Sequence, residues 1–293
     1  MSLKISTSMD YGANVGLTYP QTAEIMKQAG FQGIDLALCH GQDDPKNLLT
    51  DEWHREAVFM ADCAKQAGLE LAQCHLPYYP GHLELPGDGT PAYFESYMLP
   101  AYEQALKVCG EVGCHMAVMH LFTVLNDDEQ TLSGNVALIR RLLPLMEKYD
   151  VKLALENVFC RRNSQYLTGF VAYAENLLKV IDGVGSDRVG VCIDTGHANI
   201  FRMDTAQMAR QCGKRLFALH VNSNAGHDEH AVPYSISHWC EKQDFDAFSR
   251  ALGEIGYTGW YNLEISGGKF PPAVARPFYE YCAGVARYLA DEA

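Results

Sequence analysis

Six successive apolar segments of this chain end in a side chain that can bind a metal ion or transfer a proton. The segments read LAQCH, AVMH, LALE, VCID, FALH and YNLE, and they end at His75, His120, Glu156, Asp194, His220 and Glu264. One such residue alone is more often a hydrogen-bonded structural group, but six in succession weaken that explanation. Buried carboxylates and imidazoles are costly without partners. A shared divalent cation would remove the cost, so the pattern predicts a metal centre with mixed oxygen and nitrogen ligands.

Three further candidates lie in the segments that follow these ends. His197 comes three residues after Asp194 in DTGHAN, and Asp228 and His230 form an Asp-x-His pair after His220. An Asp-x-His pair in an extended loop can present both side chains to one cation. A solvated polar loop explains the same residues, so they are candidates for additional metal or substrate contacts, as are His75 and His120.

The elements that must position these residues alternate regularly along the chain. The apolar segments, each typical of a strand buried on both faces, are 3–9, 33–38, 69–75, 115–120, 152–157, 189–194, 216–221 and 259–265. The amphipathic segments between them predict helices over 22–29, 51–67, 93–112, 132–149, 170–181, 205–212, 244–255 and 273–289. Four of these helices stop at a glycine, which suits a left-handed C-terminal residue: Gly30, Gly68, Gly113 and Gly256.

Eight strands that alternate with eight helices predict a (β/α)₈ TIM barrel, and we expect residues 1–293 to form one such domain. The competing fold, a doubly wound open sheet, favours a glycine-rich phosphate turn after the first strand. The first turn here reads DYGANVG and does not match G-x-G-x-x-G. In a parallel barrel the carboxyl ends of all strands meet at one rim, which would bring the six terminal residues together.

Composition excludes several classes of protein. The chain has 293 residues, of which 48% are hydrophobic, and a formal net charge of −13. The acidic balance disfavours nucleic acid as a partner, because phosphate binding needs clustered Lys and Arg. No apolar stretch approaches the roughly 20 residues of a membrane span, and the first residues do not read as a signal peptide. The ten cysteines form no Cys-x-x-Cys pair, so we expect free thiols and a cytoplasmic location.

Four motifs resemble the xylose-isomerase-like (β/α)₈ superfamily, which unites sugar isomerases and epimerases with the endonuclease IV family. They are LEN after the fifth strand, DTGHA after the sixth, HVN on the seventh and GYTGWYNLE leading into the eighth. The resemblance implies that Glu156, Asp194, His220 and Glu264 hold one divalent metal ion (Mn²⁺, Zn²⁺, Co²⁺ or Mg²⁺). It also implies that the two glutamates act as the catalytic acid and base.

The endonuclease IV branch uses a three-zinc cluster with additional ligands. The matching positions are present here as His75, His120, His197, Asp228 and His230. The ligand set alone therefore leaves a multinuclear zinc site open and does not separate the two branches.

The loops at the expected rim favour the sugar-enzyme branch. The loop HGQDDPKNLLTDE is acidic, LPYYPGHLELPGDGT has neither Lys nor Arg, and NDDE follows the fourth strand. Such a rim is poor for binding duplex DNA. The segment AGFQGIDL also resembles the isomerase branch.

The sequence therefore predicts a metal-dependent isomerase or epimerase of a small sugar or sugar phosphate. It would transfer a proton next to a carbonyl through a metal-stabilised enediolate. The alternatives are an endonuclease IV-like hydrolase or lyase, an inositol-type dehydratase, and a non-catalytic sugar-binding barrel. The sequence leaves homo-oligomerisation open.

Two further groups of side chains could contact a sugar at the rim. Aromatic residues could form an apolar wall against a sugar face, although ordinary loop packing explains them equally well: Tyr78, Tyr79, Phe122, Phe159 and Trp239. Arg161 and Arg162, together with the segment 266–269 that reads SGGK, could bind a substrate phosphate.

Overall fold

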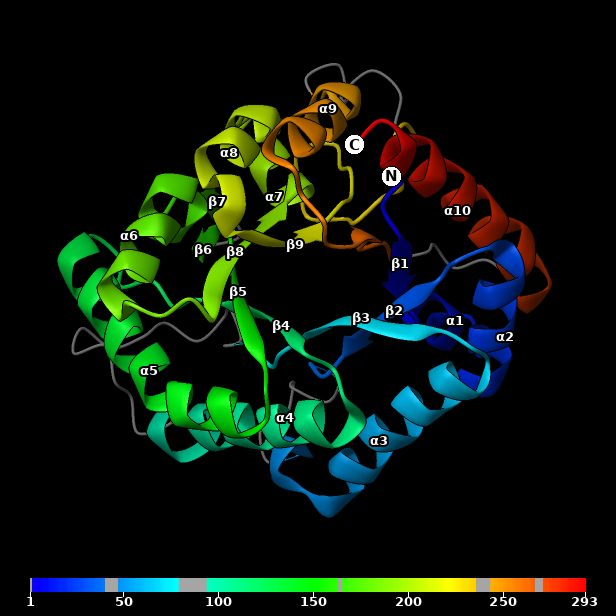
Figure 1. Ribbon diagram of the computed structural model, residues 1–293, viewed down its shortest axis with the longest axis horizontal. Helices are drawn as coiled ribbons and strands as arrows, with labels where there is room; N and C mark the ends of the chain where they lie inside the picture. The colour runs from blue at the N-terminus through cyan, green and yellow to red at the C-terminus, as the bar shows by residue number, and fades with distance from the viewer. Residues whose placement is uncertain (1, 40–46, 79–93, 163–164, 236–242, 267–270) are drawn as a thin grey trace.

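Eight parallel strands form a barrel (Figure 1). The computed structural model describes residues 2–39, 47–78, 94–162, 165–235, 243–266 and 271–293. Each barrel strand pairs with its neighbours in parallel register, and the strands run in the order β10-β1-β2-β3-β4-β5-β8-β9. Their bounds are β1 (Ile5–Ser8), β2 (Gly33–Ala37), β3 (Glu70–His75), β4 (Met116–His120), β5 (Lys152–Glu156), β8 (Val189–Asp194), β9 (Leu216–His220) and β10 (Tyr261–Leu263). The TIM-barrel prediction is confirmed.

The barrel closes between β9 and β10 just beyond the end of β9. Val221 forms a parallel bridge with Leu263. The Val221 N–H donates to the Asn262 carbonyl at 2.9 Å, and the Glu264 N–H donates to the Val221 carbonyl at 3.2 Å. The closure therefore places the residues that follow β9 and β10 beside one another.

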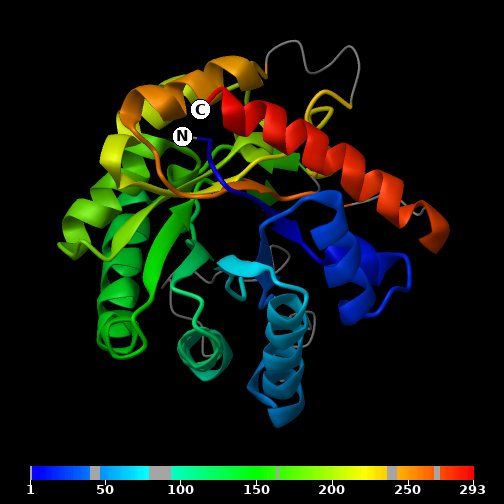
Figure 2. The ribbon, with the colours of Figure 1, turned by 45° about the vertical axis from the view of Figure 1, so that its right-hand side comes forward.

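Helices surround the strands (Figures 1 and 2). The longer ones are α2 (Tyr19–Ala29), α3 (Asp51–Gln66), α4 (Leu99–Val112), α5 (Asp128–Lys148), α6 (Ala174–Val184), α8 (Thr205–Cys212), α9 (Phe245–Ile255) and α10 (Ala275–Asp291). Short helices α1 (Asp10–Asn14) and α7 (Thr195–Ile200) follow β1 and β8. Within the described ranges, no helix is both long and apolar enough to cross a bilayer.

Local signals in the sequence set the ends of these helices. Thr50, Asp127, Asp204 and Asp244 cap α3, α5, α8 and α9, each accepting a backbone N–H three residues later. The glycines predicted to end helices have positive φ, for example 103° at Gly30 and 68° at Gly256. A residue with a Cβ is disfavoured in that region, so these stops are confirmed.

Alternation along the strands divides the interior into two parts. Alternate side chains of each strand point outward and pack in the large apolar core between strands and helices, for example Met119, Leu155 and Ile193. The side chains between them point into the barrel. There Val118, Ala154, Cys192 and Ala218 form a separate small apolar cluster. The next inward residue on each of these four strands is a predicted site residue: His120, Glu156, Asp194 and His220.

The structure corrects several predicted bounds. The predicted helix 93–112 is a π-helical turn (Phe94–Met98) followed by α4, and the predicted helix 170–181 is a 3₁₀ turn (Phe170–Ala172) followed by α6. Extended backbone at Tyr173 separates the latter two. A hairpin of β6 (Cys160–Arg162) and β7 (Gln165–Leu167), which the sequence reading missed, follows β5. The nine described cysteines are free thiols, as predicted.

Candidate metal and active site

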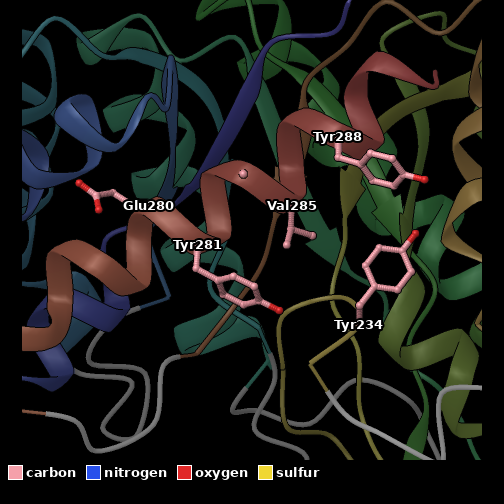
Figure 3. A pocket seen from close by; sticks show the side chains of 6 residues that line it. Tyr234, Glu280, Tyr281, Val285 and Tyr288 are labelled. Carbon is pink, nitrogen blue, oxygen red and sulfur yellow. The ribbon is translucent and has the colours of Figure 1, made fainter.

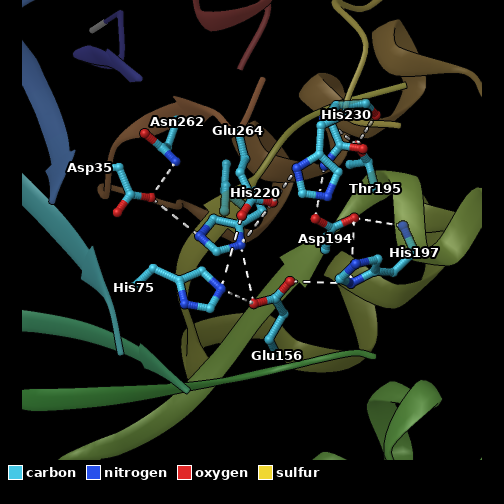
Figure 4. A network of polar contacts seen from close by, with 12 residues as sticks. Asp35, His75, Glu156, Asp194, Thr195, His197, His220, His230, Asn262 and Glu264 are labelled. Carbon is cyan, nitrogen blue, oxygen red and sulfur yellow. Dashed lines mark hydrogen bonds and ion pairs between the residues drawn. The ribbon is translucent and has the colours of Figure 1, made fainter. Parts of the chain in front are cut away.

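The six predicted strand-end residues converge at one mouth of the barrel. Figure 4 labels all of them except His120. Five of them end β3, β4, β5, β8 and β9. The predicted last strand, 259–265, is shorter in the structure, so Glu264 follows β10 by one residue. Glu156, Asp194 and His220 are fully buried, and the Glu264 side chain is 16% exposed.

The predicted metal quartet forms one compact group. Glu156, Asp194, His220 and Glu264 each offer a ligand atom, and these atoms all lie within 4.8 Å of one another. His220 is central to the group: its Nδ1 is 3.2 Å from Glu156 Oε2 and 3.4 Å from Glu264 Oε2.

The five additional candidates border this quartet. His120 Nε2 is 3.0 Å from Glu156 Oε2, and His75 Nε2 is 3.7 Å from the same oxygen. His75, Glu156 and His220 form a second group with metal-binding spacing, and Asp194, His197 and His230 form a third. Asp228 joins the third group, since its Oδ1 is 2.9 Å from His230 Nε2 and 3.8 Å from His197 Nε2.

Unsatisfied buried atoms test whether these residues fit a cation. Glu156 Oε1, His220 Nδ1 and Glu264 Oε2 are buried and have no hydrogen-bond partner. Leaving such groups unpaired is costly, and the cost is greatest for charged ones. One divalent cation bound by three carboxylates and an imidazole would satisfy all three atoms, so the quartet fits the expected metal ion.

The electrostatic environment separates the two glutamates. Burial raises the pKa of Glu264 to about 8. Burial also acts to raise the pKa of Glu156, but the positive charges of His220 and His120 outweigh it and hold that pKa well below its usual range. Burial and the neighbouring His120 lower the pKa of His75 to about 4. Glu156 and Glu264, two carboxyl groups of the same candidate ligand set, thus have different proton affinities.

The N-terminus of α7 and two asparagines, Asn157 and Asn222, orient Asp194. This residue caps α7, and its Oδ1 accepts the His197 N–H at 2.6 Å. Its Oδ2 accepts from Asn222 Nδ2 at 2.8 Å, and its backbone N–H donates to Asn157 Oδ1 at 2.8 Å. The motifs LEN, DTGHA and HVN therefore meet in one hydrogen-bonded unit.

The sequence reading missed Asp35 on β2. Its side chain is 4% exposed, and its Oδ2 lies 3.3 Å from His220 Nε2, on the side of the ring away from the glutamates. A charged residue inside the otherwise apolar strand GIDLA was the available signal.

Aromatic rings line part of the site. Tyr78 packs against His75 and His120, and Phe159 meets the edge of His197. Tyr166 of the hairpin contacts Phe159, and its hydroxyl accepts the Asp228 N–H at 3.1 Å. Phe122 instead packs against Gly134 in the core.

Other rim candidates are only partly described. The Arg161 guanidinium lies over the Tyr166 ring, with 5.4 Å to the centroid. Tyr79, Trp239, the Arg162 side chain and residues 267–269 of the predicted phosphate segment lie outside the described residues.

A surface hollow lies apart from this chemistry. It is lined by Tyr234, Glu280, Tyr281, Gly284, Val285 and Tyr288 (Figure 3). The hydroxyls of Tyr234 and Tyr288 both donate to Asp246 Oδ1, which joins the loop after β9 to α9 and α10.

Comparison with known proteins identifies the family. The family model described as "Xylose isomerase-like TIM barrel" matches residues 23–278. The chain belongs to this family.

The names of individual relatives include both of the enzyme classes that the motifs resemble. D-psicose 3-epimerase of Enterocloster bolteae is 30% identical over 47% of this chain and 41% of its own length. A protein of Methanoculleus marisnigri named probable endonuclease 4 is 31% identical over 42% of this chain and 41% of its own length. The chain thus spans half the length or less of the curated relatives it matches. A crystal structure of D-psicose 3-epimerase superposes with a TM-score of 0.73 and 16% identity, covering 98% of this chain and 99% of that one, which supports the fold.

Cation binding should stabilise the protein measurably. A cation that binds only the folded state adds about 2.7 kcal/mol at a concentration of a hundred times its Kd. For a chain of this size that corresponds to a rise in Tm of roughly 4–5 °C. We expect Mn²⁺ or Co²⁺ to produce this rise in a thermal unfolding experiment and a chelator to reverse it. The Asp194→Asn variant should lose most of the rise, and a wild-type Tm that does not respond to divalent cations would contradict the metal site.

Proposed function

We propose that this protein is a divalent-metal-dependent isomerase or epimerase of a small sugar, with Glu156 and Glu264 as its acid and base. The observation that carries the proposal is the position of the two carboxylates. Glu156 ends β5 and Glu264 follows β10. Each has an oxygen within 3.4 Å of His220 Nδ1, and each has a buried oxygen that makes no hydrogen bond. A substrate carbon held between them could lose a proton to one and receive a proton from the other.

In this proposal the carboxylates perform the proton transfers. One removes the proton from the carbon next to the substrate carbonyl, and the other returns a proton. Return to the opposite face of the same carbon inverts it, whereas return at the neighbouring carbon exchanges ketose and aldose. Tyr78 and Phe159 border the site and would exclude water from one side of the sugar.

The quartet of Glu156, Asp194, His220 and Glu264 would hold the metal ion. A bound divalent cation supplies Lewis-acid polarisation of the substrate carbonyl and offsets repulsion between the carboxylates. The relative that acts as a D-psicose 3-epimerase supports a ketose as the substrate class.

Solvent hydrogen exchange tests this proposal directly. The purified protein, loaded with Mn²⁺ or Co²⁺, is incubated in heavy water with a panel of ketoses. We expect deuterium in the recovered substrate and in a product that is an epimer or aldose isomer of it. Apart from the deuterium, the product should have the same mass as the substrate. Chelated protein and the Glu264→Gln variant serve as controls. Loss of water from the product would indicate a dehydratase instead, and tight sugar binding without exchange would indicate a binding protein.

One observation favours a second candidate, a multinuclear hydrolase of the endonuclease IV type. The second and third ligand groups could each hold a further ion beside the quartet, and a relative is named probable endonuclease 4. Elemental analysis separates the candidates: about three zinc ions per chain with cleavage of abasic DNA would support the hydrolase. One ion per chain would support the isomerase, which the acidic sequences of the loops after the predicted second and fourth strands also favour.

A further inference from the structure

Asp35 is a buried carboxylate that lies beside His220 of the quartet. Its Oδ2 accepts from Gln73 Nε2 at 2.8 Å and from Asn262 Nδ2 at 2.9 Å. The Asn262 amide is oriented in turn, because Ser6 Oγ donates to its Oδ1 at 2.8 Å. Residues from three other strands (β1, β3 and β10) therefore fix the direction of one carboxylate oxygen.

His220 lies between this carboxylate and the two glutamates of the quartet (Figure 4). Its Nε2 is 3.3 Å from Asp35 Oδ2, and its Nδ1 is 3.2 Å from Glu156 Oε2. A neutral imidazole carries one N–H and one lone pair. If Nδ1 binds a cation with its lone pair, the proton must be on Nε2, the nitrogen that lies 3.3 Å from Asp35 Oδ2.

We propose that Asp35 is a positioning residue that holds His220 in the tautomer and orientation needed to bind the metal ion through Nδ1. A carboxylate that accepts the second N–H of a metal-binding histidine fixes the ring and makes its other nitrogen a stronger ligand. The proposal rests on the proposed function only in requiring a cation at the quartet. Asp35 itself faces away from the glutamates and does not act on substrate.

The competing explanation gives Asp35 a purely structural role. In that case it would only link β2 to β3 and β10 through the Gln73 and Asn262 amides. Its replacement would then lower stability without changing how His220 binds a cation, so cation affinity and the His220 tautomer separate the two explanations.

The affinity experiment compares two variants of the barrel interior. The Asp35→Asn variant keeps the shape of the side chain but removes the charge. We expect it to bind Zn²⁺ about 10–100-fold more weakly than wild type in competition with a chromophoric chelator. Thr7→Val is the matched control, because it removes a buried hydrogen bond to the Leu263 carbonyl rather than a partner of His220. It should retain wild-type affinity. Equal affinity of Asp35→Asn and wild type would overturn the proposal.

A spectroscopic measurement on the wild-type protein keeps the test decisive if Asp35→Asn does not fold. In ¹⁵N NMR of the Zn²⁺-loaded protein, His220 should carry its proton on Nε2 and bind through Nδ1. A proton on Nδ1 would overturn the proposal. Neither readout uses turnover, so the role of Asp35 can stand or fall separately from the isomerase activity.

Discussion

The Glu264→Gln variant is expected to lose turnover by at least about a hundredfold while remaining folded, and Glu156→Gln should do the same. Removing a general acid or base typically costs a factor of about 10²–10⁴. Glutamine keeps the shape of each side chain but cannot take up or release the proton. The measurement is the rate of ketose epimerisation or isomerisation with saturating cation, together with deuterium exchange.

A surface substitution of the same kind provides the control. Glu254 lies on α9 and pairs with Arg210 at an exposed position. Glu254→Gln should retain full turnover. Wild-type activity in either Glu156→Gln or Glu264→Gln would disprove the paired acid–base role, and a cooperative thermal transition in each variant would show that the barrel still forms.

The Gly196→Ala variant is expected to disrupt the site through Asn222. An added Cβ would lie 1.8 Å from Asn222 Oδ1, far inside van der Waals contact. The Asn222 amide cannot move freely, because its Nδ2 holds Asp194 Oδ2 at 2.8 Å. Overpacking of this kind typically costs about 1–3 kcal/mol. We expect a comparable loss in the free energy of unfolding and, because Asp194 would be displaced, weaker cation binding in a chelator competition.

Gly284 offers the same substitution without the clash. It lies on α10, and a Cβ there would meet nothing within 4 Å. Gly284→Ala should stabilise the protein by up to about 1 kcal/mol, since alanine favours the helix, and should leave cation binding unchanged. Wild-type cation affinity in Gly196→Ala would show that Asn222 does not hold Asp194 in place.

The sequence predicted the barrel and most of the site because both follow from short-range patterns. Buried parallel strands read as apolar runs, and in a TIM barrel every strand end reaches the same rim. His120, Glu156, Asp194 and His220 could thus be placed together without any knowledge of distances. Their roles in catalysis remain proposals.

Features that depend on long-range contacts could not be predicted from the sequence. Asp35 becomes informative only when β9 brings His220 to within 3.3 Å of it across the barrel. The hairpin β6–β7 was missed because its strands have three residues each and lack a long apolar run. The break at Tyr173 is a backbone feature that helical periodicity on both sides conceals.

The bridge from Val221 to Leu263 joins the last strand to its neighbour right beside His220 and Glu264. During synthesis, Glu264 is the last of the four quartet residues to be made. A nascent chain that stops before β10 would present only part of the coordination sphere. If the quartet holds a cation, its complete ligand set would then form only when β10 closes the barrel.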